Sequence, residues 1–191
     1  MLLKIRKKNK ILTLLFLAIS VAIKFTTALM VPFVLIYIYR NEKVFKRIIY
    51  CILSGISIIG FVILMYMPYY REMSIFTNML VQGEKYCQSI LAILIHILDY
   101  NVFKNINAII IMEFIIYYIT VTFKILLKEK IKLKEIFREI NLILILFIFV
   151  VITNFHEWYI IWLIPTLFLQ RKYMRYFIVS LTIVSLIYPI N

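Results

Sequence analysis

The stretch from Ile48 to Met67, IIYCILSGISIIGFVILMYM, decides the fold class, because it contains no charged residue along its whole length. A helix of about 20 apolar residues, rising ~1.5 Å per residue, crosses the hydrocarbon core of a bilayer. A second run of similar length, 106–127, contains only Glu113 and Lys124 as charged residues. Both runs therefore predict transmembrane helices.

The composition extends this prediction to the whole chain of 191 residues. Hydrophobic residues make up 64% of it and charged residues 16%, whereas ordinary soluble domains are about half apolar and a quarter charged. These values exclude a water-soluble globular domain and a disordered chain. Shorter apolar runs occupy residues 11–39, 89–98, 140–153, 159–169 and 177–190. We expect an all-α polytopic transmembrane helical bundle of about six or seven helices, some of half length, forming one transmembrane domain over residues 1–191.

The positive charges predict the orientation of these helices. The net charge is +13, and 18 of the 22 Lys and Arg residues lie in four clusters, at 4–10, 40–47, 124–138 and 171–175. Cytoplasmic loops of membrane proteins collect Lys and Arg, so we expect all four clusters and the N-terminus in the cytoplasm. We expect membrane lipid as the partner, and no nucleic acid. A basic stub before an apolar run is also typical of a signal peptide, but no small-residue cleavage site follows, which favours a retained first helix.

With both flanking clusters inside, residues 11–39 must enter the membrane and return. Lys24 interrupts this run midway and predicts a hairpin or broken helix with its turn near 24–27. The alternative is a single long helix, which would leave one basic cluster outside. The hairpin places residues 68–105 and 154–158 outside as well, with a helix near 89–98 lying in the membrane interface.

The four cations outside the clusters, Lys24, Arg71, Lys85 and Lys104, all fall on the predicted outer face. A Lys side chain at membrane depth costs free energy, so its presence there indicates a function or a route to water. The functional interpretation is a site where Lys24 and Arg71, with or without Lys85, hold a lipid phosphate. The alternative is that each side chain reaches along the apolar surface to water or headgroups.

Other chemistry-bearing residues give weaker signals. His96 and Asp99 could share a helix face, as a catalytic pair or as an ordinary interfacial pair. No third ligand accompanies them, so we expect no metal site. Glu113 is either a buried hydrogen-bonded residue or part of a polar site. Two cysteines are too few for a disulfide framework.

The most specific stretch is NFHEWYIIWLIP at 154–165, which contains both tryptophans of the protein. In a helix, four aromatic residues share one face: Phe155, Trp158, Tyr159 and Trp162. They could form an aromatic belt at the bilayer interface. They could instead form a wall for a sugar or a polyprenyl chain, with His156 and Glu157 at its mouth.

The FHEWYIIWLIP segment (155–165) resembles the H-P-W-Y-x-x-W-x-x-P stretch of integral-membrane glycosyltransferases of the GT-C superfamily. The similarity is greatest to polyprenol-phosphate-mannose-dependent mannosyltransferase-like proteins of bacteria and archaea. AIKFTTA (22–28), followed by Pro32, resembles their A-x-K-x-T/P stretch. MPYY (67–70) resembles the P-Y/F-W/Y that opens their next external loop. The three pieces occur in the family's order.

The resemblance implies a multi-pass inverting transferase of a bacterial or archaeal cytoplasmic membrane. Such enzymes move a hexose, here expected to be mannose, from a polyprenyl-phosphate sugar to an acceptor on the extracytoplasmic face, without a cofactor. Lys24 would lie near the donor phosphate. The candidate substrate-binding set also contains Arg71, His156, Glu157, Trp158 and Tyr159.

One departure from the family's pattern concerns the catalytic base. The family carries a catalytic Asp ahead of the Lys-containing segment, and this sequence has no Asp before Asp99. We therefore expect the C-terminal part of such an enzyme, with the base unknown and a separately encoded N-terminal half as partner. The alternatives are a non-catalytic multi-pass subunit that completes another enzyme and, last, a small transporter, which would need more polar residues at mid-bilayer.

Overall fold

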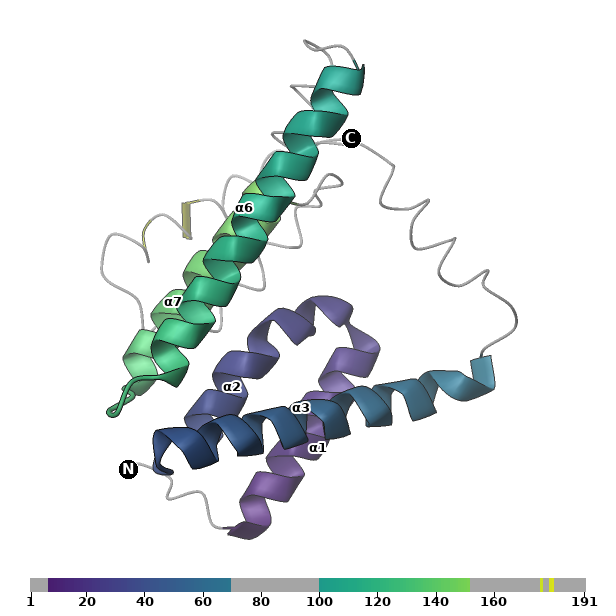
Figure 1. Cartoon of the computed structure of the whole chain (residues 1–191). Coiled ribbons are helices and arrows are strands. Elements are labelled where there is room, and N and C mark those ends of the chain that lie inside the picture. Colours follow the sequence, from purple (N-terminus) through teal and green to yellow (C-terminus); the bar gives the residue numbers. More distant parts are fainter. Residues whose placement is uncertain (1–6, 70–99, 152–175, 177–178, 181–191) are drawn as a thin grey trace. The chain divides into compact units, whose positions relative to one another are not determined.

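The computed structural model describes residues 7–69 and 100–151, together with positions 176, 179 and 180 (Figure 1). This part of the chain contains five α-helices and no strand, so the prediction of an all-α fold is confirmed for it. The interfacial helix expected near 89–98 lies outside the described residues. The chain forms two compact units: the first combines the part up to Met73 with Thr122–Ile136, and the second combines Ser74–Val121 with the part from Phe137 onward.

The first unit begins with a helical hairpin. Helix α1 (Lys7–Ile23) is followed by the 3₁₀ helix η1 (Phe25–Met30) and by α2 (Val31–Ile38). Lys24 has an extended backbone, with φ −146° and ψ 104°, which ends α1. Pro32 stands in the first turn of α2, where the missing amide hydrogen has no intrahelical role. The predicted break at Lys24 is therefore confirmed, and the single long helix is excluded.

Helix α3 (Val44–Tyr66) packs against α1 and α2. The buried core between the three helices consists of Leu17, Ala18, Leu35, Ile38 and Ile58. A hydroxyl–hydroxyl hydrogen bond of 2.8 Å between Tyr39 and Ser54 ties the end of α2 to the side of α3. Apolar packing thus holds the hairpin to α3, and the Tyr39–Ser54 hydrogen bond fixes the position of α2 along α3.

Polar contacts at the two ends of this unit give the helix directions. The Lys10 ammonium lies 4.0 Å from the Glu42 carboxylate and 5.2 Å from the centre of the Tyr39 ring. The start of α1 is therefore beside the end of α2. At the other end, the Tyr66 hydroxyl donates a 2.5 Å hydrogen bond to the carbonyl of Ala22. Helices α1 and α3 therefore run in the same direction, and α2 runs back.

Two long segments follow. Helix α6 (Tyr100–Leu126) begins six residues before the apolar run that predicted it, and α7 (Leu133–Leu146) continues into the π-helical turn Phe147–Val151. The basic cluster at 124–138 was expected as a cytoplasmic loop, but α7 already begins at Leu133 within it. Lys, Glu and Arg are good helix formers, and Glu135 in the first turn suits the positive end of the helix dipole.

In the second unit, α7 presents a buried apolar face. Ile140, Ile143 and Leu144 are almost fully buried, and Ile148 in the π-helical turn is completely so. The rings of Phe114 and Phe147 lie 5.9 Å apart, which joins the middle of α6 to the end of α7. This spacing is typical of a favourable tilted aromatic pair.

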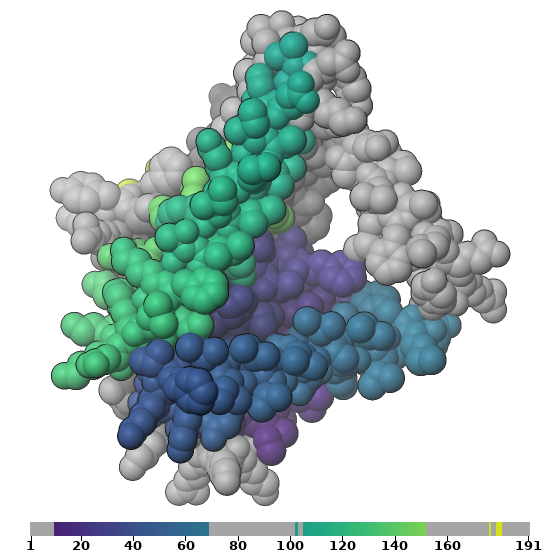
Figure 2. Space-filling view, in the orientation of Figure 1, coloured from purple at the N-terminus to yellow at the C-terminus, as the bar shows by residue number. Residues whose placement is uncertain are grey.

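Two helical segments are long and apolar enough to cross a membrane, judged by length and composition: Val44–Tyr66 and Asn105–Leu126. Within the most apolar 18-residue window of each segment, only 11% is buried, whereas the core helix of a soluble protein would be mostly buried. In the view of Figure 2, α3 lies at the front of its unit with its outer surface uncovered. The exposed side chains on α3 include Ile52, Ile56, Ile59, Ile63 and Leu64.

Candidate functional site at the hairpin tip

Lys24 occupies the tip of the hairpin, between α1 and η1. Its side chain is half-buried, and loss of solvation lowers the pKa of its ammonium group from the ordinary value of a lysine. Partial burial disfavours the charged form, and a bound anion would offset that cost.

Two hydroxyl groups stabilise the turn on either side of Lys24. The Thr27 hydroxyl donates to the carbonyl of Ser20 at 3.3 Å, and the Ser20 hydroxyl lies 3.5 Å from the Thr27 hydroxyl oxygen. The backbone amide of Thr27 donates to the carbonyl of Lys24 at 2.9 Å. The Ser20 carbonyl also accepts from the backbone amide of Lys24 at 3.0 Å, so the Thr27 hydroxyl is its second donor. The Lys24 carbonyl, beyond the end of α1, receives its donor from the amide of Thr27.

The end of α3 forms the neighbouring wall of the tip. Tyr66 donates its hydroxyl hydrogen to Ala22, and its ring stacks on Phe25 with 5.6 Å between centroids. The 3₁₀ turn Met67–Tyr69 follows directly. Two of the three family-like segments, the one at 22–28 and the one that begins at Met67, are therefore brought together.

The remaining predicted site residues lie outside the described part of the chain. These are Arg71, His156, Glu157, Trp158 and Tyr159, together with the His96–Asp99 pair and Lys85. Of the predicted substrate-binding set, the structure therefore places Lys24. Among the described residues, the tip offers one cation, Lys24, with hydroxyl and aromatic side chains beside it.

No carboxylate among the described residues of this unit stands at the tip. Glu42 pairs with Lys10 and Glu135 pairs with Lys128, and both pairs belong to the opposite end. No group of three His, Cys, Asp or Glu that could hold a metal occurs in the described ranges. From these residues the tip offers a cation and no carboxylate that could act as a general base.

The structure excludes one of the two environments that were considered for Glu113. It is exposed on α6, as are Ile109 and Ile116 one turn before and after it. The prediction of a buried, hydrogen-bonded residue is therefore wrong. Helix α6 is apolar on every side and shows no amphipathic pattern, so its sequence does not indicate which face packs inward.

A second polar centre, at the opposite end of the first unit, was not singled out by the sequence. The Arg47 side chain is only 1% exposed and donates to four backbone carbonyls. One terminal nitrogen donates to Leu126 and Lys128 at 2.9 and 2.6 Å, and the other to Arg40 and Glu42, both at 3.1 Å.

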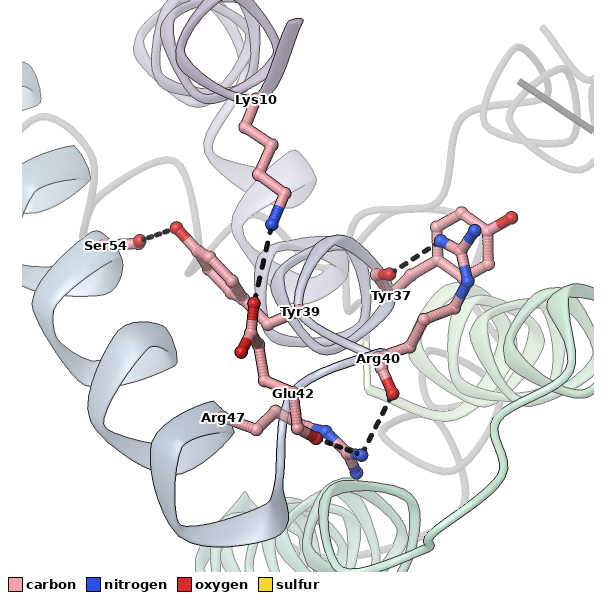
Figure 3. A network of polar contacts seen from close by, with 7 residues as sticks. All are labelled: Lys10, Tyr37, Tyr39, Arg40, Glu42, Arg47 and Ser54. Atoms are coloured by element: carbon pink, nitrogen blue, oxygen red, sulfur yellow. Dashed lines mark hydrogen bonds and ion pairs between the residues drawn. The ribbon is translucent and has the colours of Figure 1, made fainter. Parts of the chain in front are cut away.

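Figure 3 shows the bonds from Arg47 to Arg40 and Glu42, in the turn between α2 and α3. Leu126 is the last residue of α6, where the helix dipole favours a cation. The other three acceptors lie in the turns that follow α2 and α6: Arg40, Glu42 and Lys128. In sequence, Arg47 looks like the other three cations of its cluster. Its one distinguishing feature is its position immediately before the uncharged stretch that starts at Ile48.

Comparison with protein families, with characterised proteins and with solved structures finds no match for this chain.

Proposed function

We propose that the chain is the membrane-embedded, C-terminal part of a GT-C-type glycosyltransferase. In this proposal the hairpin tip binds the phosphate of a polyprenyl-phosphate hexose on the extracytoplasmic face of a bacterial or archaeal membrane. The observation that carries it is the contact between Tyr66 and Ala22, which puts Lys24 beside the segment that starts at Met67. These two segments are the ones whose sequences resemble the family.

A membrane setting is supported by the exposed apolar surfaces of α3 and α6. Their exposed Ile and Leu side chains would be costly in water and are satisfied by lipid. The finer expectation of a polytopic bundle follows from the apolar runs in the rest of the chain. The orientation follows from the charges, because the cations of the turns at 40–47 and 124–134 lie at the end of the first unit opposite the tip.

The chemistry assigned to the tip is electrostatic. The C–O bond between the sugar and the lipid phosphate breaks as the acceptor oxygen attacks, and the departing phosphate gains negative charge. Lys24 would stabilise that charge, which is the usual role of a cation at a leaving phosphate. The base that removes the acceptor proton would come from the separately encoded N-terminal half.

The test is donor binding by the full chain in lipid nanodiscs, with polyprenyl-phosphate mannose as the probe. We expect Lys24→Gln to weaken binding about tenfold or more, because a charge-assisted contact to phosphate is lost. Lys24→Arg should keep most of the affinity. Lys172→Gln, which removes the same charge elsewhere in the sequence, serves as the matched control.

Equal binding by the wild type and Lys24→Gln would contradict the proposal. So would equal losses in Lys24→Gln and Lys172→Gln, since that result would assign the effect to net charge.

A second candidate function is a non-catalytic subunit that completes another membrane enzyme. The observation that favours it is the uncovered face of α3, where Ile56 is 61% exposed. A photo-crosslinker placed at Ile56 in the native membrane would then give one discrete protein adduct. Adducts with lipid alone would assign this face to the bilayer and exclude the subunit interface there.

A further inference from the structure

The end of the first unit opposite the tip is strongly basic, and Arg47 assembles it from two distant segments. Its four hydrogen bonds join the turn at 40–43 to the turn that follows α6. Two segments about 80 residues apart in sequence thus form one surface. We call it the basic rim, and its exposed lysines are Lys43, Lys46, Lys124, Lys130, Lys132 and Lys134.

The charge of the basic rim is largely uncompensated. Two of the nearby acids already have partners: Glu42 pairs with Lys10, and Glu135 pairs with Lys128. Among the described residues, Glu129 is the one exposed acid beside the six lysines, and none of these lysines forms an ion pair there. The rim therefore presents a net positive surface that favours an anionic partner.

Apolar side chains stand among these lysines. Phe45, between Lys43 and Lys46, is 74% exposed, and Leu127, beside the turn that follows α6, is 57% exposed. Free inorganic phosphate offers no apolar surface against which a protruding phenyl ring could pack. At the boundary between headgroups and acyl chains, the ring enters the apolar layer while the lysines reach the phosphates.

We propose that the basic rim is a binding surface for the headgroups of anionic phospholipids in the cytoplasmic leaflet. The rim fits a lipid surface because it combines clustered Lys next to a membrane-spanning helix with exposed apolar anchors. Arg47 sets the spacing of the lysines without contacting lipid, since its guanidinium is buried and both terminal nitrogens donate to carbonyls. The proposal requires a membrane location and does not depend on glycosyl transfer.

The test measures lipid retained by the full chain, purified in mild detergent and incubated with equal amounts of phosphatidylglycerol and phosphatidylcholine. The wild type should retain phosphatidylglycerol preferentially. The triple variant K43Q/K46Q/K130Q should lower that preference about tenfold, because each lysine near an anionic surface contributes appreciably to binding. The control R171Q/K172Q/R175Q removes the same number of charges from another basic cluster and should lower the preference less, because it leaves the rim intact. Circular dichroism checks that both variants are folded.

Further results would overturn the proposal. Equal losses in the two triple variants would mean that net charge alone attracts the lipid. Full displacement of phosphatidylglycerol by equimolar inorganic phosphate, or by a short DNA duplex, would identify a different anion as the ligand. Donor binding at Lys24 is measured separately with polyprenyl-phosphate mannose, so loss of one activity can be told apart from loss of the other.

Discussion

Replacing Arg47 by Met should destabilise the folded chain by about 3–5 kcal/mol, since removing one side of a buried polar network leaves its partners unpaired. Four backbone carbonyls would lose their donor, and they belong to the ends of two helices and the turns beyond them. Met fills a similar volume, so the loss reflects the hydrogen bonds more than a cavity. We expect the effect to appear as a large fall in the midpoint of thermal unfolding in nanodiscs.

A lysine at this position should recover only part of the stability. The guanidinium donates from two nitrogens in a fixed fork, and an ammonium group cannot reach all four carbonyls at once. The neighbouring Lys46→Gln variant is the matched control, because Lys46 is exposed and should change stability by less than about 0.5 kcal/mol. If R47M unfolded at the wild-type temperature, Arg47 would not hold the two turns together.

Leu35→Ala should destabilise the first unit by about 2–5 kcal/mol, the usual cost of a large-to-small change in a packed core. Leu35 is 3% exposed and belongs to the cluster with Leu17, Ala18 and Ile58, where α2 meets α1 and α3. The cavity would loosen the return arm of the hairpin.

Its control is Ile52→Ala on the outer face of α3. Ile52 is 56% exposed, so the loss of its side chain creates no cavity inside the unit. Chemical unfolding in detergent, followed by circular dichroism, compares the two variants. Similar losses in both would contradict the packing of α2 between its neighbours.

Several parts of this structure could be predicted from the sequence because they depend on local chemistry. A lysine in the middle of an apolar run is hard to keep in a continuous membrane helix, and α1 ends at Ile23, directly before Lys24. The uncharged stretch from Ile48 is long enough to span a bilayer, and all of it up to Tyr66 lies within α3. The clusters at 40–47 and 124–138 were expected on one side, and Arg47 does join them.

Other parts depend on distant contacts that the sequence does not display. Arg47 is buried because the turn after α6, about 80 residues later in the chain, packs against it. Exposure of Glu113 depends on which face of the uniformly apolar α6 packs inward. Tyr66 belongs to an apolar run, and only the fold turns its hydroxyl toward the carbonyl of Ala22.

The proposed orientation of the first unit, with the hairpin tip outside and the basic rim in the cytoplasm, can be tested directly by finding on which side of the membrane each end lies. Single cysteines would be introduced as Ala28→Cys at the tip and Lys130→Cys at the basic rim, both exposed positions, in a C51S/C87S background. Intact cells are treated with a membrane-impermeant maleimide before and after permeabilisation. We expect Ala28→Cys to react in intact cells and Lys130→Cys to react only after permeabilisation. Reaction of both cysteines from the same side, or the reverse pattern, would contradict it.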